Sequence, residues 1–423
     1  MGNNKAEKKK EISKTAESRM ADHNSFAPGE RDKERNYGLD VLRCVAMIMV
    51  VILHFLDKGG LLRTLSDEGN FTAKDVTAWL LEALCIVAVN LYMLMSGYLL
   101  YQGRFRLSRL LGLVGKVWLY SVMVGFIGIA LGTPAEPVDT YFKLRLLFPI
   151  SMNTYWFMTA YIFFYMLVPV LGIAARAMTR TQMKVMLGCL IFFHVIIKSI
   201  TPAQLTVDAS GMDAMWYVVL FFVSVYIRRF CSKNVTEVVQ SNGTVAESSN
   251  GLSGNSVTYV LLYVVAALLI FGEAMALRTV YIKTGSLSYI LNISYAYNHV
   301  LVLLASVLLF IAFLKAKIPS GIGKVFAFLG KYSLGVYLLH ENLSVRYAWE
   351  PLLGSGRAAS PVGVIGTSVL AGVVVFISGV IVDLIGTKIA GFMLYLIKKA
   401  PVFKKIALAV SKADSAFDGV LND

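Results

Sequence analysis

The chain is poor in charged residues and has few cysteines, and both shortages narrow the class of protein it can be. Only 16% of its 423 residues are charged, while 57% are hydrophobic, which disfavours a soluble protein of this length. Four scattered cysteines, three of them in apolar runs, exclude a disulfide framework and a cysteine metal cluster. No cleavable signal peptide is expected, because the first apolar run follows a polar tail.

Several motifs of soluble enzymes are also missing. The five histidines are far apart and lack the HExxH spacing of a zinc site, so no metal is predicted. There is no glycine-rich phosphate loop, no G-x-S-x-G elbow, and no polar stretch long enough for a separate soluble catalytic domain. The net charge of +14 does not require a nucleic-acid partner, and none is predicted, because membrane proteins collect Lys and Arg on their cytoplasmic side.

The sequence is instead rich in apolar runs of about 20 residues, the length that crosses a bilayer as a helix. They predict an all-α polytopic membrane protein with a bundle of about ten transmembrane helices. The ten expected spans are 38–56, 77–101, 110–132, 154–174, 185–201, 214–230, 257–275, 293–314, 332–352 and 362–396.

The basic residues indicate how this bundle is oriented. With the N-terminus placed inside, the inner segments carry 27 Lys and Arg, and the outer loops carry 9. Without the N-terminal tail the numbers are 18 and 9, so the bias keeps its sign. Both termini are therefore predicted to be cytoplasmic.

Composition divides the chain into three parts. Residues 1–36 are polar and charged, which predicts a disordered cytoplasmic tail. Residues 37–397 form the predicted transmembrane domain, with a flexible cytoplasmic loop at 233–256 that is rich in Ser, Asn and Gly. Residues 398–423 are expected to be a cytoplasmic segment whose amphipathic helix lies on the membrane surface.

The first apolar run, LDVLRCVAMIMVVILHF, contains three groups that are costly to remove from water. Arg43 and His54 are 11 residues apart, which places them on one helix face about 16 Å apart, and Asp40 is one turn before Arg43. Two interpretations remain open. In the first, the three polar residues line a polar path through the bundle. In the second, Asp40 and Arg43 reach the inner membrane interface while His54 caps the outer end of the helix.

This run resembles the first helix of the acyltransferase family 3 membrane proteins, in which an Arg is followed after ten residues by a His. Three further segments resemble family motifs in the expected order: VNLYMLMSGYLL (89–100), YWFMTAYIFFYMLVPVL (155–171) and KYSLGVYLLH (331–340). The resemblance covers about residues 36–396. The chain departs from some members in having no Gly-Asp-Ser esterase-like domain, and in the spaced arginines of YQGRFRLSRL, where many members have paired arginines and a Pro.

The resemblance implies a membrane O-acyltransferase of a bacterial cell membrane. Such an enzyme moves an acyl group, here expected to be acetyl, from cytoplasmic acyl-CoA to a hydroxyl of an extracytoplasmic polysaccharide or its lipid-linked precursor. Acetyl-CoA is then a co-substrate, and no permanently bound cofactor is expected. Membrane lipid, acyl-CoA and the glycan acceptor are the expected partners.

Acyl transfer needs a base for the acceptor hydroxyl, and His54 is the candidate because imidazole titrates near neutral pH. Arg43 is too basic for that role and is expected to bind an anionic donor or stabilise developing negative charge, with Asp40 in support. Three arginines are expected at the cytoplasmic end of the bundle, where they are candidates for binding the coenzyme A phosphates: Arg104, Arg106 and Arg109. The alternative is the ordinary positive charge of cytoplasmic segments, which alone explains any single arginine slightly better.

Other polar and aromatic residues are weaker candidates. Acceptor binding or cavity lining is expected of six residues: Ser96, Tyr98, Tyr155, Trp156, His340 and Glu341. For Tyr155 and Trp156 an interfacial aromatic belt is the alternative, and for His340 it is a helix-packing hydrogen bond. Glu82 is a supporting candidate, and the sequence assigns no role to Lys116, Glu273, His299 or Asp383.

Two other functions fit the same features. A transporter also uses intramembrane Arg, His and Glu, although its halves often show matching hydropathy, which is not found here. A non-catalytic membrane module that binds substrate for another enzyme is the second alternative.

Overall fold

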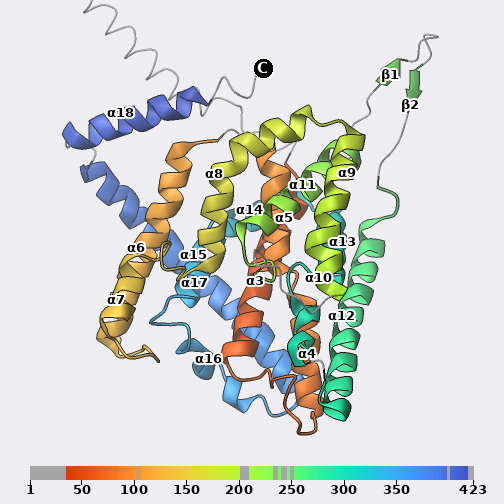
Figure 1. Ribbon diagram of the computed structural model, residues 1–423. Coiled ribbons are helices and arrows are strands. Elements are labelled where there is room, and N and C mark those ends of the chain that lie inside the picture. The colour runs from red at the N-terminus through yellow and green to blue at the C-terminus, as the bar shows by residue number, and fades with distance from the viewer. Residues whose placement is uncertain are drawn as a thin grey trace, which may run out of the picture.

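Long helices make up most of the described chain (Figure 1). The computed structural model describes residues 35–101, 105–200, 209–231, 237–239, 245–247, 252–286, 288–397 and 401–417. Within these ranges, ten helical segments are long and apolar enough to cross a membrane. The prediction of an all-α protein with about ten spans is confirmed, and the chain is a multi-pass membrane protein by the length and composition of its helices.

Some spans are single helices and others are built from two or three shorter ones. In chain order they are α3 (Tyr37–Lys58), α4 with α5 (Ala73–Cys85, Ala88–Leu100), α6 (Leu107–Leu131), α8 (Trp156–Ala177), α9 with η1 and α10 (Arg180–Ile191, Phe192–Ile196, Ile197–Ile200), α11 with η2 (Ala214–Tyr226, Ile227–Cys231), α12 (Ser256–Thr284), η4 with α13 (Ile293–Tyr295, Val300–Leu314), α14 with α15 (Ser320–Gly330, Ser333–His340) and α17 (Pro361–Ile397).

Shorter elements connect or follow the spans. They are α7 (Thr140–Leu147), β1 (Glu237–Val239), β2 (Val245–Glu247), η3 (Ser288–Ile290), α16 (Trp349–Leu352), η5 (Ser355–Arg357) and α18 (Pro401–Ala416). The strands β1 and β2 pair antiparallel within the loop predicted at 233–256, whose other described residues, 252–256, lead into α12. Residues 1–34 of the predicted tail lie outside the described residues, and Asn36, placed in that tail, is the N-cap of α3.

The helix starts follow ordinary capping chemistry, in which a short polar side chain accepts a hydrogen bond from a free N–H of the first turn. Asn36 accepts from Gly38, and Thr72 and Asp75 form a reciprocal capping box that begins the second span at Ala73, four residues before the predicted start. Asn255 caps α12 in the same way. These polar residues separate the apolar runs, which is why sequence and structure agree on most boundaries.

The ninth span was predicted wrongly. It was expected at 332–352, but it runs from Ser320 to His340 as α14 and α15, so His340 and Glu341 lie at its end. The helix stops there because Asn342 turns inward and donates to the carbonyl oxygens of Tyr120 (3.2 Å) and Ser121 (3.3 Å) on α6. These long-range contacts leave no periodic signal in the sequence.

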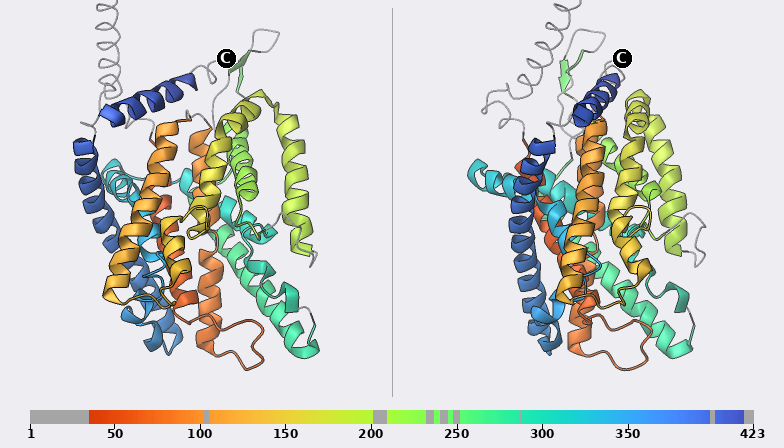
Figure 2. Two further views of the ribbon diagram at one scale, coloured as in Figure 1. Left: turned by 60° about the vertical axis from the view of Figure 1, so that its left-hand side comes forward. Right: turned by 90° about the vertical axis from the view of Figure 1, so that its left-hand side faces the viewer.

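Helix α3 is the centre of the bundle. It packs against α4, α5, α13, α14, α15 and α17, and most of its side chains are buried (Figures 1 and 2). Helices α6, α12 and α17 instead expose many large apolar side chains, as expected where a helix faces lipid. The polar residues of the first span are therefore enclosed by protein.

Backbone breaks inside the spans are satisfied by buried polar side chains. Asn90, near the start of α5, donates to the carbonyl oxygen of Tyr297 (2.8 Å), which lies in the non-helical stretch before α13. Asn90 also donates to Ser306 Oγ (3.2 Å) and accepts from Trp216 Nε1 (2.9 Å). Irregular backbone at membrane depth is tolerated only where protein or a wet cavity satisfies it, and Asn90 supplies that partner.

An ion pair between Lys116 of α6 and the buried Asp383 of α17 holds α15 in place. The Lys116 ammonium lies 2.6 Å from Asp383 Oδ2, and the Tyr120 hydroxyl donates to Asp383 Oδ1 at 2.7 Å, which joins α6 to α17. The Asp383 carboxyl lies directly against Gly335 of α15, where an added Cβ would collide with its carboxyl carbon. Only glycine permits this approach, so Gly335 sets the position of α15 and of the side chains it carries.

We predict that Gly335→Ala lowers the stability of the folded protein. The added methyl must displace the Asp383 carboxyl, and overpacking of this kind costs about 1–3 kcal/mol. Thermal unfolding in detergent measures the effect. Gly366→Ala is the matched control, because Gly366 is exposed on α17 and its Cβ would meet no atom within 4 Å. Equal melting temperatures for the two variants would contradict this role of Gly335.

Candidate active site

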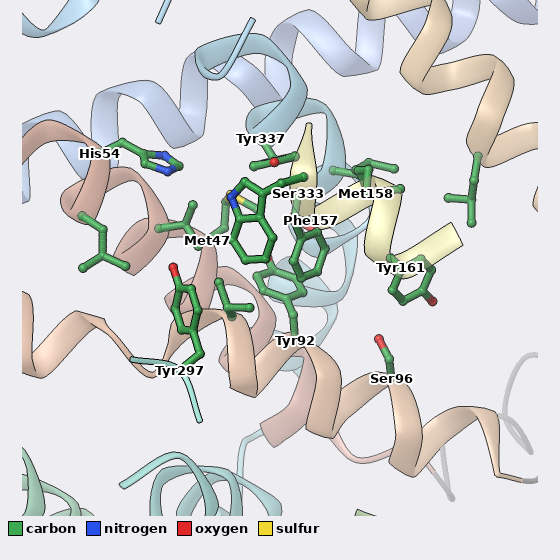
Figure 3. Close-up of a pocket in the computed structure, with 16 residues that line it drawn as sticks. Met47, His54, Tyr92, Ser96, Phe157, Met158, Tyr161, Tyr297, Ser333 and Tyr337 are labelled. Carbon is green, nitrogen blue, oxygen red and sulfur yellow. The ribbon is translucent and has the colours of Figure 1, made fainter. Parts of the chain in front are cut away.

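A cavity of about 170 Å³ lies inside the bundle beside α3 (Figure 3). Its wall is mainly apolar and aromatic, with few polar side chains. The lining residues are Met47, Val50, Leu53, His54, Val89, Tyr92, Ser96, Leu113, Trp156, Phe157, Met158, Tyr161, Tyr297, Ser333, Leu334 and Tyr337. Figure 3 shows His54 and Tyr297 pointing from different segments toward the same space. A small apolar group with one polar end matches such a lining.

The aromatic wall comes from the start of α8 and the break before α13. The rings of Trp156 and Tyr297 stack, with their centroids 5.7 Å apart. Phe157 lies 5.9 Å from Tyr337 and 6.1 Å from Tyr92, both in edge-to-face contacts. Because aromatic rings hold their positions with few rotatable bonds, these contacts make a rigid wall around the cavity.

Two histidines from distant parts of the chain meet at the cavity. His54 Nδ1 lies 2.9 Å from His340 Nε2, and His340 Nδ1 lies 2.7 Å from the carbonyl oxygen of Val336. A carbonyl only accepts, so His340 Nδ1 carries the proton, and in the neutral ring His340 Nε2 accepts from His54. His54 Nδ1 is then protonated, and its Nε2 bears the lone pair. This relay fixes the tautomer that a general base needs.

Glu341 and Lys58 complete the group around His54. The carboxylate oxygen Oε1 of Glu341 lies 3.3 Å from His54 Nδ1 and also pairs with the Lys58 ammonium, one turn after His54 on α3. Burial alone would raise the pKa of the Glu341 carboxyl, but the positive charge around it, including the Lys58 ammonium, lowers that pKa below its usual range. Glu341 is therefore ionised at neutral pH and is placed to stabilise a protonated His54.

A metal site is the alternative interpretation of His54, His340 and Glu341. Ligand atoms of His54, His340 and Glu341 lie within 4.8 Å of one another, and imidazole and carboxylate are ligands that zinc accepts. However, the two imidazole nitrogens are one hydrogen bond apart, and the Lys58 ammonium neutralises Glu341. A second cation would be repelled there, so the geometry fits a hydrogen-bonded His–His–Glu group better than a metal site.

Arg43 lies on the face of α3 that also bears Met47, Val50 and His54. It is part-buried and is not a lining residue of the cavity, but the hydroxyl of Tyr92, which does line it, donates to the Arg43 carbonyl at 2.8 Å. Asp40 is held mainly by Arg35, through two hydrogen bonds of 2.7 and 2.8 Å, whereas Arg43 Nη1 is 3.6 Å away. Arg43 is therefore less tightly paired than its spacing from Asp40 suggests.

Two of the three arginines expected at the cytoplasmic end of the bundle are among the described residues. Arg104 lies outside the described residues. Arg109 is exposed, and its guanidinium lies 5.6 Å from the ring centre of Tyr165, which stacks at 6.4 Å on the cavity residue Tyr161. Arg106 is the N-cap residue of α6. Along α6, Arg109 thus precedes the cavity residue Leu113 by about one helical turn, and Arg106 precedes it by about two.

The structure brings some of the remaining predicted residues together and leaves others apart. Ser96 and Trp156 line the cavity, and His340 contacts His54 directly. Tyr98 does not line the cavity, because two residues along a helix rotate a side chain by about 200°, and its ring packs on Phe310 at 5.7 Å. Tyr155 is also outside the lining: its buried hydroxyl donates to the Leu338 carbonyl at 3.2 Å and accepts from Asn342 at 3.0 Å.

Three intramembrane acidic or histidine candidates lie away from this cavity. Glu82 has one carboxylate oxygen that is buried without a hydrogen-bond partner. His299 is 1% exposed, and its Nε2 lies 3.5 Å from Glu273 Oε1. None of the three is a lining residue of the cavity.

Several residues of this group were not anticipated from the sequence. Lys58 was counted as an outer-loop charge, although it follows His54 by four residues and so shares its helix face. Tyr92 precedes Ser96 by the same spacing, which was a usable signal. Tyr297 offered none, because it reaches the cavity from a non-helical stretch. Glu350, in α16, is fully buried, and burial raises its pKa to about 7.

Comparison with known proteins assigns the chain to a family. The model of the acyltransferase 3 family, described as an acyltransferase domain, matches residues 36–385, which is most of the chain. No match was found among curated proteins or among solved structures. The matched range includes α3, the cavity and the His54–His340 pair. The chain therefore belongs to the acyltransferase 3 family, a family of membrane acyltransferases.

Proposed function

We propose that this protein transfers an acetyl group from acetyl-CoA in the cytoplasm to a hydroxyl of an extracytoplasmic polysaccharide or its lipid-linked precursor, in a bacterial cell membrane. The observation that carries the proposal is the hydrogen-bonded group of His54, His340 and Glu341 beside the cavity, because its contacts imply that His54 Nε2 is unprotonated. The mainly apolar lining of the cavity also suits the alkyl part of a short acyl group.

The chemistry follows from this geometry. His54 Nε2 removes the proton of the acceptor hydroxyl as its oxygen attacks the thioester carbonyl carbon. Glu341 stabilises the imidazolium that forms, while His340 keeps the ring oriented. When the tetrahedral intermediate collapses, the carbon–sulfur bond breaks, and the proton held by His54 passes to the departing thiolate. The products are an ester and free coenzyme A, and His54 returns to its starting state.

Direct transfer is favoured over a covalent acyl-enzyme. The thiol of Cys44 is buried and lies 3.6 Å from the Phe326 carbonyl oxygen, away from His54. The hydroxyl of Ser333 does border the cavity but bonds to the Gly330 carbonyl at 3.0 Å. Neither is hydrogen-bonded to His54, as an activated nucleophile would be.

Donor and acceptor are proposed to approach from opposite ends. Arg106 and Arg109 lie at the end of the bundle that the charge count places in the cytoplasm, where coenzyme A is available. Its phosphates would contact these arginines while the long thioester arm passes along Arg43 to His54. The acceptor would reach His54 from the other end, past Trp156 and Tyr297, whose flat rings suit a sugar face.

A vesicle experiment tests this function. The protein is reconstituted with its α18 end outward, with labelled acetyl-CoA outside and chemically deacetylated cell-surface polysaccharide inside. We expect label on the enclosed polysaccharide and an equal release of free thiol outside. Polysaccharide that crosses the membrane unmodified, without thiol release, would identify a transporter. Binding of both compounds with neither transfer nor transport would identify a non-catalytic module.

We predict that His54→Ala lowers the rate of transfer by a factor of about 10² to 10⁴, the usual contribution of a general base. The initial rate of thiol release by the purified variant measures the loss. His194→Ala is the control, because the part-buried ring of His194 bonds the Leu190 carbonyl, one turn earlier in the same span, and does not line the cavity. Near-normal transfer by a folded His54→Ala protein would remove His54 from the mechanism.

We predict that replacing Arg106 and Arg109 together by Gln raises the KM for acetyl-CoA and makes the remaining affinity less sensitive to salt, because two charges that face the phosphates are lost. Steady-state rates at several ionic strengths measure both effects. Arg180→Gln is the matched control, an exposed arginine at the start of α9 that contacts Tyr226. An unchanged KM in the double variant would assign the two arginines to membrane topology alone.

A further inference from the structure

The C-terminal helix α18 crosses the end of α6 that carries Arg106 and Arg109 (Figures 1 and 2). Its Asp414 carboxylate accepts two hydrogen bonds from one residue of α6. Ser108 N–H donates to Oδ1 at 3.2 Å, and Ser108 Oγ–H donates to Oδ2 at 2.6 Å. Asp414 is buried, at 9% exposed, whereas Ser108 lies at the surface of α6.

This contact replaces a cap that α6 lacks. The N-cap residue is Arg106, whose side chain has no acceptor, and it makes no capping hydrogen bond. The free N–H groups of a first helical turn need acceptors, and a carboxylate also suits the positive end of the helix dipole. Asp414 provides both from 306 residues away in the sequence. The first turn of α6 is therefore ordered by a different part of the chain.

A second contact joins the same two elements. The ring of Phe417, after α18, lies 4.8 Å from Phe105, which stacks at 5.2 Å on Tyr165 of α8. The Tyr165 hydroxyl accepts from the Arg106 N–H at 3.3 Å, and the Arg109 guanidinium lies over the Tyr165 ring. Asp414 and Phe417 thus act on the five residues 105–109, which contain both arginines.

We propose that α18 is a clamp that positions this arginine segment for the phosphates of the acyl donor, and that Asp414 is its positioning residue. The inference rests on the proposed function, because it assigns a role toward the same donor. Asp414 does not touch the reacting atoms. Its effect comes through the order of the first turn of α6, which fixes where the guanidinium groups of Arg106 and Arg109 are held.

The negative charge of Asp414 acts on donor binding in the opposite direction from its capping hydrogen bonds. A carboxylate beside two arginines repels an anion, so Asp414 would weaken donor binding if its charge mattered more than its capping. Both of its oxygens are, however, bound by Ser108, and loss of these bonds frees the turn that bears the arginines. The direction in which the KM changes therefore distinguishes the clamp from a competing anion.

The test compares full-length Asp414→Ala with wild type in lipid nanodiscs. We expect the KM for acetyl-CoA to rise about five-fold, the equivalent of the ~1 kcal/mol that loss of a helix cap costs, with kcat at saturating acetyl-CoA unchanged. Hydrogen exchange should become faster at the backbone amides of residues 107–110. Ser415→Ala is the matched control, because Ser415 is exposed and its hydroxyl donates to the Ser411 carbonyl within α18 itself.

Ser108→Ala, alone and combined with Asp414→Ala, tests whether the Ser108–Asp414 contact is what positions the arginines. Ser108→Ala should weaken donor binding less than Asp414→Ala, and in the Asp414→Ala background it should add little, because the two residues share one interaction. A lower KM in Asp414→Ala, or faster exchange with an unchanged KM, would overturn the clamp. If wild type neither binds nor uses acetyl-CoA, the proposed function fails instead; unchanged exchange in Asp414→Ala would then separately refute the ordering of α6.

Discussion

The hydrogen bond between His54 Nδ1 and His340 Nε2 joins the central helix α3 to α15, and the arrangement of the cavity depends on it. It only forms if α15 is held at the correct depth, which the Gly335–Asp383 contact provides. His54 is the donor in this bond, because His340 Nδ1 donates its proton to the Val336 carbonyl and leaves Nε2 as the acceptor. The packing at Gly335 thus sets the position of α15, and the position of α15 in turn sets which nitrogen of His54 carries the proton.

Burying polar groups in a membrane protein is costly unless each finds a partner, and here the partners come from distant segments. Asp383 is satisfied by Lys116 and Tyr120, and Asn90 by Trp216, Tyr297 and Ser306. These networks explain why several spans are interrupted without losing their place in the bundle. His54 differs from these residues: its ring is part-exposed, and its second nitrogen is available for chemistry.

The site was most predictable where its residues share one helix face or one sequence motif. The 11-residue spacing of Arg43 and His54 placed them on one face, and the segments around Ser96, Trp156 and Ser333 all contribute to the cavity wall. The prediction was weaker where a side chain lies near a helix end. Tyr98 turns to the far side of α5, Tyr155 bonds to Asn342, and Asp40 pairs chiefly with Arg35, which the sequence placed in a tail.

The sequence by itself determined that the chain is an all-α membrane protein with ten apolar spans, because hydrophobic length and helical periodicity are local properties. It also contains, in the expected order, the four segments that resemble motifs of the acyltransferase 3 family. Only the tertiary structure decided that His340 meets His54, that Lys58 and Glu341 pair beside them, and that Asp414 caps α6. These contacts join residues more than 280 positions apart, and no local propensity encodes such distances; they form only when buried polar groups must find partners as the helices pack.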